Sequence, residues 1–168
     1  MELREIDLLK ADFNPFKMVG KDWFLITAGN DQGFNTMTAS WGGFGVMWNK
    51  NVATIVVRPQ RRTIDFLNES GYFTISFFDE KFRDILKFCG ANSGRDVDKI
   101  QVTGLKPIFL DGTTTFEQAN KVLICKKLFS QKIDENSFID KALLSNYPSK
   151  DFHYAFVGEI LKAVEIVK

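Results

Sequence analysis

The chain has 168 residues, with 22 Lys and Arg against 21 Asp and Glu, one His and two Cys. That length fits a single domain, residues 1–168, and a chain of this size buries about 70% of its unfolded surface without help from disulfides or a metal. A formal net charge of +1 gives no global field for nucleic acid or an anionic membrane, and 45% hydrophobic residues with 17 Phe exclude disorder.

Nothing in the sequence indicates secretion or a membrane span. The first seven residues carry four charges and contain no apolar segment of the kind a signal peptide needs. The longest uncharged stretch, 32–49, is interrupted by four glycines and is polar, so it cannot cross a bilayer. Cys89 and Cys125 are a widely separated pair that fits reduced thiols. We therefore expect a cytoplasmic protein.

Strand patterns dominate the chain, and short helices separate some of them. The run 23–28 ends at the turn formed by Gly29, Asn30 and Asp31, and the run 53–58 is stopped by Pro59, which cannot continue a ladder. In chain order we predict strands at 23–28, 35–41 and 53–58, a helix at 64–69 with Thr63 as N-cap and Gly71 closing it, a strand at 72–78, a helix at 82–89 ended by Gly90, a strand at 121–129, a helix at 137–145 and a strand at 153–167.

The predicted elements indicate a mainly β protein. Six strands and three small helices occur without strict β-helix-β alternation, and no segment has the composition of a linker. A β-barrel with peripheral helices fits this pattern best.

Several reaction classes are excluded by residue counts and motifs. One His and two distant Cys cannot make a zinc site of the usual ligand spacing, so we expect no metal. The sequence has no G-x-S-x-G, no G-x-x-x-x-G-K-[ST] and no G-x-G-x-x-G. A triad of Ser40, His153 and an Asp is arithmetically possible, but any protein of this size offers such a trio. The sequence therefore indicates no catalytic acid or nucleophile.

A basic cluster, Arg58-Pro59-Gln60-Arg61-Arg62-Thr63, joins a strand to a helix. Free backbone N–H groups, the positive end of the helix dipole, a Thr hydroxyl and up to three guanidinium groups converge there, which is the chemistry that binds a phosphate monoester. A solvated basic turn paired with nearby acids explains the same residues equally well.

A second cluster, Asn35-Thr36-Met37-Thr38-Ala39-Ser40-Trp41, combines amide, hydroxyl and indole groups. On a strand, Thr36, Thr38 and Ser40 share one face, and Met37, Ala39 and Trp41 share the other. Such a polar row could bind the edge of a planar heterocycle while Trp41 covers its face. A half-buried amphipathic strand is the simpler interpretation.

A third segment, Ser93-Gly94-Arg95-Asp96-Val97-Asp98-Lys99, follows the second predicted helix. Its composition by itself favours a surface connection.

Taken in order and at this spacing, the three segments resemble the flavin-reductase-like, FMN-binding split-barrel family, and within it the flavoredoxin-like branch. The resemblance covers nearly the whole chain, and His153-Tyr154-Ala155-Phe156-Val157-Gly158-Glu159-Ile160 is similar to the family's closing strand. It implies a split β-barrel of Greek-key type, with about six strands and a few short peripheral helices.

The resemblance also implies roles for particular residues. FMN would be the cofactor, and Asn35, Met37, Thr38, Ala39 and Ser40 would contact its isoalloxazine and ribityl parts, with Trp41 packed beside the ring system. Arg58, Arg61 and Thr63 would hold the phosphate, Lys99 would lie near the pyrimidine end, and Ser93 belongs to the same loop motif. Family members are typically homodimers with FMN near the interface.

Two departures from the family pattern leave details open. Arg62 stands where the branch usually has an aromatic residue, so its place in the phosphate site is undecided. Lys50 and Asn51 occupy a stretch that often carries proline, which affects the shape of a loop where a reducing partner would approach.

The resemblance predicts an FMN-binding redox protein, in which hydride or electrons pass through flavin N5. It would be either an NAD(P)H-dependent flavin reductase or a flavoredoxin-type carrier that receives electrons from a protein donor. Such chemistry belongs to the cofactor, so the protein needs no catalytic acid or nucleophile of its own.

Two other functions compete with this prediction. One is a non-catalytic FMN-binding or redox-sensing module. The other is a nucleic-acid-binding or partner-binding barrel that uses Arg58, Arg61 and Arg62, but near-zero net charge and the lack of a basic stripe disfavour it.

Overall fold

The structure is a computed structural model that describes residues 2–167. Its strands are β1 (Glu2–Glu5), β2 (Phe24–Asn30), β3 (Gly33–Ala39), β4 (Gly42–Met47), β5 (Lys50–Val57), β6 (Tyr72–Phe77), β7 (Pro107–Leu110), β8 (Thr113–Phe116), β9 (Lys121–Lys132) and β10 (Tyr154–Val167). Its α-helices are α1 (Pro15–Lys17), α2 (Thr63–Glu69), α3 (Arg83–Ala91) and α4 (Lys99–Thr103). A π-helix, η1 (Met18–Asp22), continues α1, and the 3₁₀ helices are η2 (Glu80–Phe82), η3 (Glu135–Ser137) and η4 (Lys141–Asn146).

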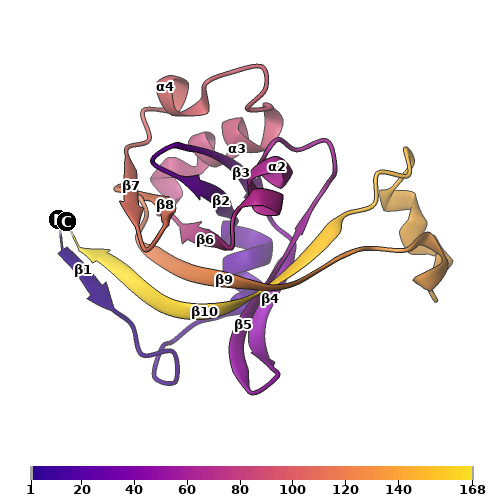
Figure 1. The fold of residues 1–168 in the computed structure, drawn as a ribbon, viewed down its shortest axis with the longest axis horizontal. Coiled ribbons are helices and arrows are strands. Elements are labelled where there is room, and N and C mark those ends of the chain that lie inside the picture. The colour runs from indigo at the N-terminus through magenta and orange to yellow at the C-terminus, as the bar shows by residue number, and fades with distance from the viewer. Residues whose placement is uncertain (1, 168) are drawn as a thin grey trace.

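Eight of the strands form one antiparallel sheet in the order β3-β2-β6-β9-β10-β5-β4, with β1 paired to the second half of β10. The sheet curves around its own core, with the long strands β9 and β10 sweeping across it (Figure 1). Its two end strands, β3 and β4, are joined directly by Ser40 and Trp41. The fold is therefore mainly β and a split barrel, as predicted.

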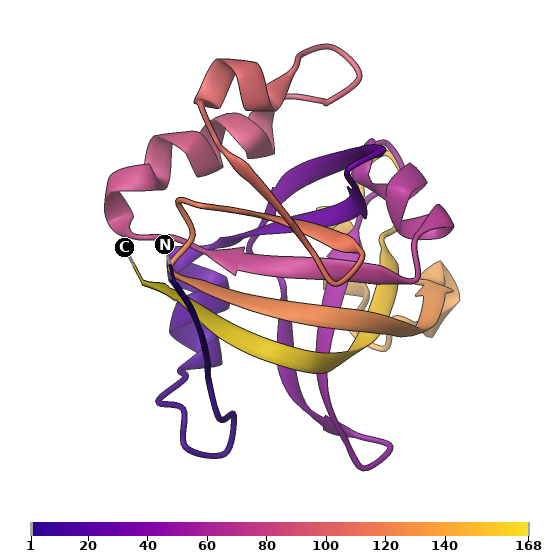
Figure 2. The ribbon, with the colours of Figure 1, turned by 60° about the vertical axis from the view of Figure 1, so that its left-hand side comes forward.

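Two apolar clusters lie on opposite faces of the sheet. Inside the curve, Phe24, Met37, Ile55 and Phe73 belong to a buried core, and α2 contributes Leu67 to it. On the outer face, α3 and the β7–β8 hairpin cover β2, β6 and β9 (Figure 2). In this second layer α3 also packs against β3, which contains most of the predicted ligand-binding segment 35–41.

Hydroxyl side chains of the sheet bond to one another across β2 and β3 and to β8 in the outer layer. Thr27 Oγ1 lies 2.9 Å from Thr36 Oγ1, Thr74 Oγ1 donates to the carbonyl of Thr114 at 2.6 Å, and Ser76 Oγ lies 2.8 Å from Thr115 Oγ1. All six residues are buried. This threonine-rich face is an interior seam, and each of the six hydroxyl groups has a partner within the protein, as buried polar groups require.

The six predicted strands are all present, and the differences lie at their edges. β3 ends at Ala39, so Ser40 and Trp41 belong to the connection. A turn does follow the first predicted strand, but it consists of Asp31 and Gln32, because Gly29 and Asn30, expected in the turn, still belong to β2 and pair with Phe34 and Gly33. Four further strands, β1, β4, β7 and β8, were not predicted; β4 contains three glycines, which weaken any strand pattern.

The predicted helix ends need correction. Thr63 is not an N-cap, since Arg62 occupies that position and Thr63 lies in the first turn with its side chain turned inward to Asn35. The helix ends at Glu69, as predicted, but its C-cap is Ser70 rather than Gly71, and α3 continues one residue past Gly90. The third predicted helix is replaced by two short 3₁₀ helices. None of the helices in residues 2–167 is long and apolar enough to cross a membrane.

Candidate functional site

A groove lies where β3 ends and β5 meets the basic cluster. Its volume is about 170 Å³, and its lining residues are Met37, Thr38, Ala39, Ser40, Trp41, Val56, Arg58, Arg61 and His153. Hereafter it is called the β3 groove. It brings together seven of the twelve predicted site residues, from two segments some twenty positions apart in the sequence.

The main chain at Ser40 and Trp41 lies between two ladders. The β2–β3 register ends at the pair Phe24 and Ala39, and the β4–β5 register begins at Gly42 and Ile55. Gly42 makes this change of partner possible: its φ is +132°, and a Cβ there would lie 2.3 Å from the carbonyl oxygen of Thr54. The peptide groups of Ser40 and Trp41 thus have no place in either ladder and can bind the polar edge of a ligand.

Two arginines form the positive side of the groove. Arg58 donates to Asp151 at 2.6 Å and to the carbonyl of Asn146 at 2.9 Å, and its guanidinium lies 5.0 Å from the centre of the Tyr147 ring. Arg61 donates to the carbonyl of Gly90 at 2.6 Å, and its pKa is lowered by burial and by the charge of Arg58.

No ion pair to Arg61 is found within residues 2–167. Of these two nearby guanidinium groups, only that of Arg58 is paired with a carboxylate of the described chain, Asp151. This imbalance suits a bound anion such as a phosphate, which guanidinium groups bind with directional, charge-assisted hydrogen bonds.

His153 also lines this groove, although it was not among the predicted site residues. Its side chain is buried, its Nδ1 lies 2.8 Å from the Tyr147 hydroxyl, and its ring centre is 5.3 Å from that of Trp41. Burial, followed by the charge of Arg58, lowers the pKa of His153 to about 4, so the ring is neutral at neutral pH. Its position as the first residue of the last predicted strand, 153–167, was the available signal, but only the fold brings it to Trp41.

A second cleft, of about 550 Å³, holds three more predicted residues: Asn35, Arg62 and Lys99. It is hereafter called the loop cleft, because the loop residues 94–98 form one wall. Arg62 donates to the carbonyl of Gly94, while Arg95 donates to the carbonyl of Gln60 at 2.8 Å and to Asp65 at 2.6 Å. The loop is therefore bonded to the start of α2 twice, once by a side chain before the helix and once by a side chain of the loop.

Lys99 is a buried cation at the first position of α4. It is 5% exposed, and its Nζ donates to the carbonyls of Thr36 and Cys89, both at 2.8 Å. Burial is the main reason that its pKa is lowered to about 8. Its ammonium group thus lies against the main chain of β3 and is bonded to protein carbonyls.

Asn35 and Thr63 form a buried pair whose side chains meet at 2.7 Å. In the amide orientation that satisfies both groups, the Asn35 oxygen accepts from the Thr63 hydroxyl and, at 3.2 Å, from the Thr63 N–H. Asn35 then serves the N-terminus of α2 from another strand, as a capping residue would. Ser93 lies in neither lining and accepts from the Arg95 N–H at 3.1 Å.

No three His, Cys, Asp or Glu side chains in the described part of the chain gather as metal ligands would. The predicted site residues thus divide into three groups. Seven line the β3 groove, three line the loop cleft, and Thr63 and Ser93 lie between or beside them.

The mainly β split barrel is a fold of known protein families, and comparison with family models identifies which one this chain matches. Residues 18–165 match the model of the flavin reductase like domain. The chain belongs to this family. No curated protein sequence matches the chain.

Solved structures of the same fold include proteins of the predicted kind. The FMN-binding domain of a flavin reductases-like enzyme from Shewanella baltica aligns with a TM-score of 0.69 at 19% identity, over 98% of this chain and 77% of that one. Flavoredoxin from Methanosarcina acetivorans aligns with a TM-score of 0.67 at 21% identity, over 95% and 74%. Flavoredoxin of Desulfovibrio vulgaris aligns with a TM-score of 0.67 at 19% identity, over 98% and 78%. At these identities the likeness concerns the fold.

Proposed function

We propose that this chain is an FMN-binding redox protein and that the β3 groove is its flavin site. One observation carries the proposal. The groove is lined both by Arg58 and Arg61 and by Ser40 and Trp41, whose peptide groups belong to neither strand pairing. The first fits a phosphate and the second fits the edge of a flat heterocycle, at opposite ends of one ligand. Membership of the flavin reductase like family and the FMN-binding proteins of the same fold support this choice.

The chain's residues have distinct tasks in this proposal. Arg61 and Arg58 hold the phosphate, and Asp151 keeps the Arg58 guanidinium in place. Trp41, steadied by the neutral ring of His153, packs beside the planar part of the ligand. The peptide groups of Met37 to Trp41 orient its polar edge.

The residues outside the groove act indirectly. Asn35 and Thr63 fix the start of α2 and thereby the arginines that precede it. Lys99 donates a hydrogen bond to the carbonyl of Thr36, so it fixes the main chain of β3 and places a positive charge beside that strand.

Bound FMN supplies the two-electron and one-electron chemistry at its N5, which no side chain of the groove could supply. We propose that the protein is an oxidoreductase that accepts hydride from NAD(P)H. A flavoredoxin-type carrier would use the same groove but receive its electrons from a protein donor.

We also propose that the protein acts as a homodimer. The end of β4 and the turn that follows it expose Val46, Met47 and Trp48. The centre of the Trp48 ring lies 6.1 Å from that of Phe129, which is also exposed. Trp41, in the groove, is 45% exposed. A second copy of the chain against this surface would bury these side chains together, and burial of apolar area stabilises such an interface.

We place the protein in the cytoplasm, in keeping with two free and buried cysteines, Cys89 and Cys125.

The dimer is tested independently of the flavin: Trp48→Lys is expected to shift the species in analytical ultracentrifugation from dimer to monomer. A monomeric wild-type protein would reject the dimer and leave the flavin site standing.

The flavin proposal is tested by titrating the purified apo-chain with FMN and with riboflavin. FMN is expected to bind more tightly, because only FMN carries the phosphate. Failure to bind either flavin would reject the proposed function. Anaerobic addition of NADH or NADPH to the FMN-loaded protein then tests the reductase: rapid bleaching of the flavin band supports it, whereas no bleaching with either nucleotide removes it and leaves the carrier.

A further inference from the structure

A second hollow adjoins the β3 groove on the other side of the strand end. It has a volume of about 290 Å³ and is lined by Trp23, Thr38, Ala39, Ser40, Leu86, Lys87 and Gly90. Three of these residues, Thr38, Ala39 and Ser40, also line the β3 groove. A molecule in this hollow, the Trp23 hollow, would therefore share a wall with the proposed flavin. Its size is near the lower end of small-molecule pockets, roughly 300–1,000 Å³, and suits one or two rings.

Trp23 is held in a backbone conformation that side chains rarely adopt. Its φ is 66° and its ψ is 172°, a region that is populated almost only by glycine. It follows the five-residue π-helix η1, another uncommon element that is frequent at functional sites. Such a conformation is strained and persists only where its surroundings impose it.

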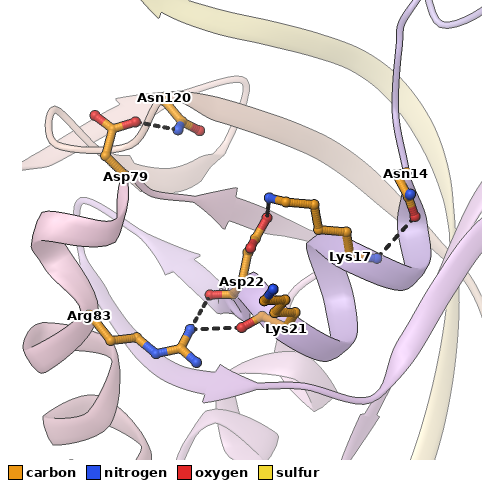
Figure 3. Close-up of polar contacts among 7 residues, drawn as sticks. All are labelled: Asn14, Lys17, Lys21, Asp22, Asp79, Arg83 and Asn120. Atoms are coloured by element: carbon orange, nitrogen blue, oxygen red, sulfur yellow. Dashed lines mark hydrogen bonds and ion pairs between the residues drawn. The ribbon is translucent and has the colours of Figure 1, made fainter.

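Arg83 provides much of that constraint from the start of α3. Its Nη1 donates to the carbonyls of Lys21 at 3.0 Å and Asp22 at 2.7 Å, so it fastens the end of η1 (Figure 3). The same guanidinium lies 3.6 Å from the centre of the Trp23 ring. Lys17 and Asp22, 2.5 Å apart, tie the first part of this segment together (Figure 3). Arg83 is thus a positioning residue for the indole.

The charge of the hollow has one sign. Lys87 is its charged lining residue, and no carboxylate is among the lining residues in the described chain. The partner of Lys87 is Asp84 at 3.2 Å, whose side chain is 94% exposed to solvent. An anion entering the hollow can therefore compete for the Lys87 ammonium at little cost.

We propose that the Trp23 hollow is a substrate subsite for a small, flat aromatic anion. The indole of Trp23 supplies an aromatic surface, Lys87 supplies one positive charge, and the shared strand end sets the ligand beside the flavin. The existence of the subsite stands on the hollow itself, whereas its role as the place of the flavin's reaction partner rests on the proposed function.

The test is isothermal titration calorimetry of the apo-chain with three probes: 2-naphthoate, its neutral counterpart 2-naphthol, and cyclohexanecarboxylate. We expect 2-naphthoate to bind most tightly. Lys87→Gln should weaken 2-naphthoate roughly threefold, as for an exposed ion pair, and leave 2-naphthol unchanged. The matched control Lys81→Gln changes a lysine that lies before α3 and outside the lining, and it should have no effect.

Trp23 is tested by Trp23→Leu and Trp23→Phe. The Leu variant should weaken both naphthyl probes roughly tenfold and leave cyclohexanecarboxylate little changed, and the Phe variant should restore most of the loss. Arg83→Met should reproduce the Leu effect, and Arg83→Lys should not rescue it, because Lys cannot bond both carbonyls while lying flat on the ring. If the Leu variant does not fold, the probe series and Lys87→Gln decide the matter alone.

Equal affinity for 2-naphthoate and cyclohexanecarboxylate, or an unchanged 2-naphthoate affinity in Lys87→Gln, would overturn the proposal. Repeating the titration with saturating FMN separates it from the proposed function. Retained 2-naphthoate binding supports a separate subsite, and competition would show that the hollow belongs to the flavin's own footprint and would reject it. Binding of the probe by a chain that takes up no FMN would leave the subsite and remove the proposed function.

Discussion

The β3 groove and the loop cleft are both basic, but they differ in the carboxylates that line them. In the groove, the charge of Arg58 acts on Arg61, and no carboxylate is among the lining residues in the described part of the chain. In the cleft, three carboxylates belong to the lining, those of Asp31, Asp96 and Asp98. The larger of the two cavities is therefore the one in which negative side chains oppose the positive ones.

This difference shows that the number of arginines in a segment is a poor guide to where an anion binds. Arg61 and Arg62 are neighbours in the sequence, yet one faces the groove and the other clamps the loop. What separates them is the direction in which the start of α2 turns each side chain. An anion site needs donors that the protein leaves available.

The largest expected effect comes from replacing these two neighbours in turn. Arg61→Ala should weaken FMN binding by roughly ten- to a hundredfold, since a hydrogen bond to a charged group contributes about 1.5–3 kcal/mol, and should change riboflavin binding little. Arg62→Ala should change FMN binding by less than about threefold. Fluorescence titration of the apo-proteins with both flavins measures this. An equal loss in both variants would erase the distinction between the two regions.

The next effect concerns Lys99, whose pKa is lowered to about 8 in the folded protein. Between about pH 8 and the ordinary Lys pKa of 10.5, the unfolded chain binds more protons than the folded one, so this group makes the free energy of unfolding rise with pH. Lys99→Met should lack that rise, by roughly 2 kcal/mol between pH 8 and pH 10. Urea unfolding at both pH values measures it, with Lys81→Met as control. Parallel pH slopes would contradict a buried, charged Lys99.

His153 should show a smaller pH effect, in the acid range. Its pKa of about 4 lies below the ordinary 6.5, so the unfolded chain binds more protons between these values and stability falls as the pH drops. At pH 5.5 the loss should be about 1 kcal/mol relative to pH 7 in the wild-type protein and absent in His153→Gln. Thermal or urea unfolding across this range provides the measurement. If His153→Gln lost as much stability on acidification, another group would be responsible.

The smallest effect should come from the exposed clamp of the loop cleft. Arg95 and Asp65 form an ion pair with both side chains about half exposed. Arg95→Ala should lower the free energy of unfolding by less than about 1 kcal/mol, and the difference should shrink at high salt. FMN affinity should stay as in the wild type. A marked loss of FMN binding in Arg95→Ala would mean that the loop takes part in the flavin site.

The sequence sufficed for the regular parts of this fold and for the pieces of the site. Strands such as β2, β6 and β10 have β-branched and aromatic runs that predict them directly. β4 escaped prediction because its three glycines pack through backbone pairing with β5, which no side-chain pattern records. The prediction that Thr63 is the N-cap of its helix was also wrong. Asn35, which is distant in sequence, bonds the start of that helix in the way a capping side chain would.

Neighbours from distant parts of the chain were the main gap at the site. The meeting of Trp41 with His153 depends on β10 pairing beside β5, and Arg61 reaches Gly90 only because α3 covers β3. Neither contact can be predicted from the local sequence pattern around its residues. The polar seam of Thr27, Thr36 and Thr74 shows the same limit, since a threonine face has the same pattern whether water or a second layer of hydroxyl groups covers it.

The pairing of β10 has a consequence for the order in which this protein can assemble. β10 runs along β9 on one side and holds β5 and β1 in succession on the other, so three otherwise unconnected strands meet on it. A ribosome delivers residues 154–167 after all three of those strands. During translation, β4 and β5 therefore cannot join the rest of the barrel until β10 has been made. Until then the edge of β5 is exposed and one wall of the β3 groove is incomplete.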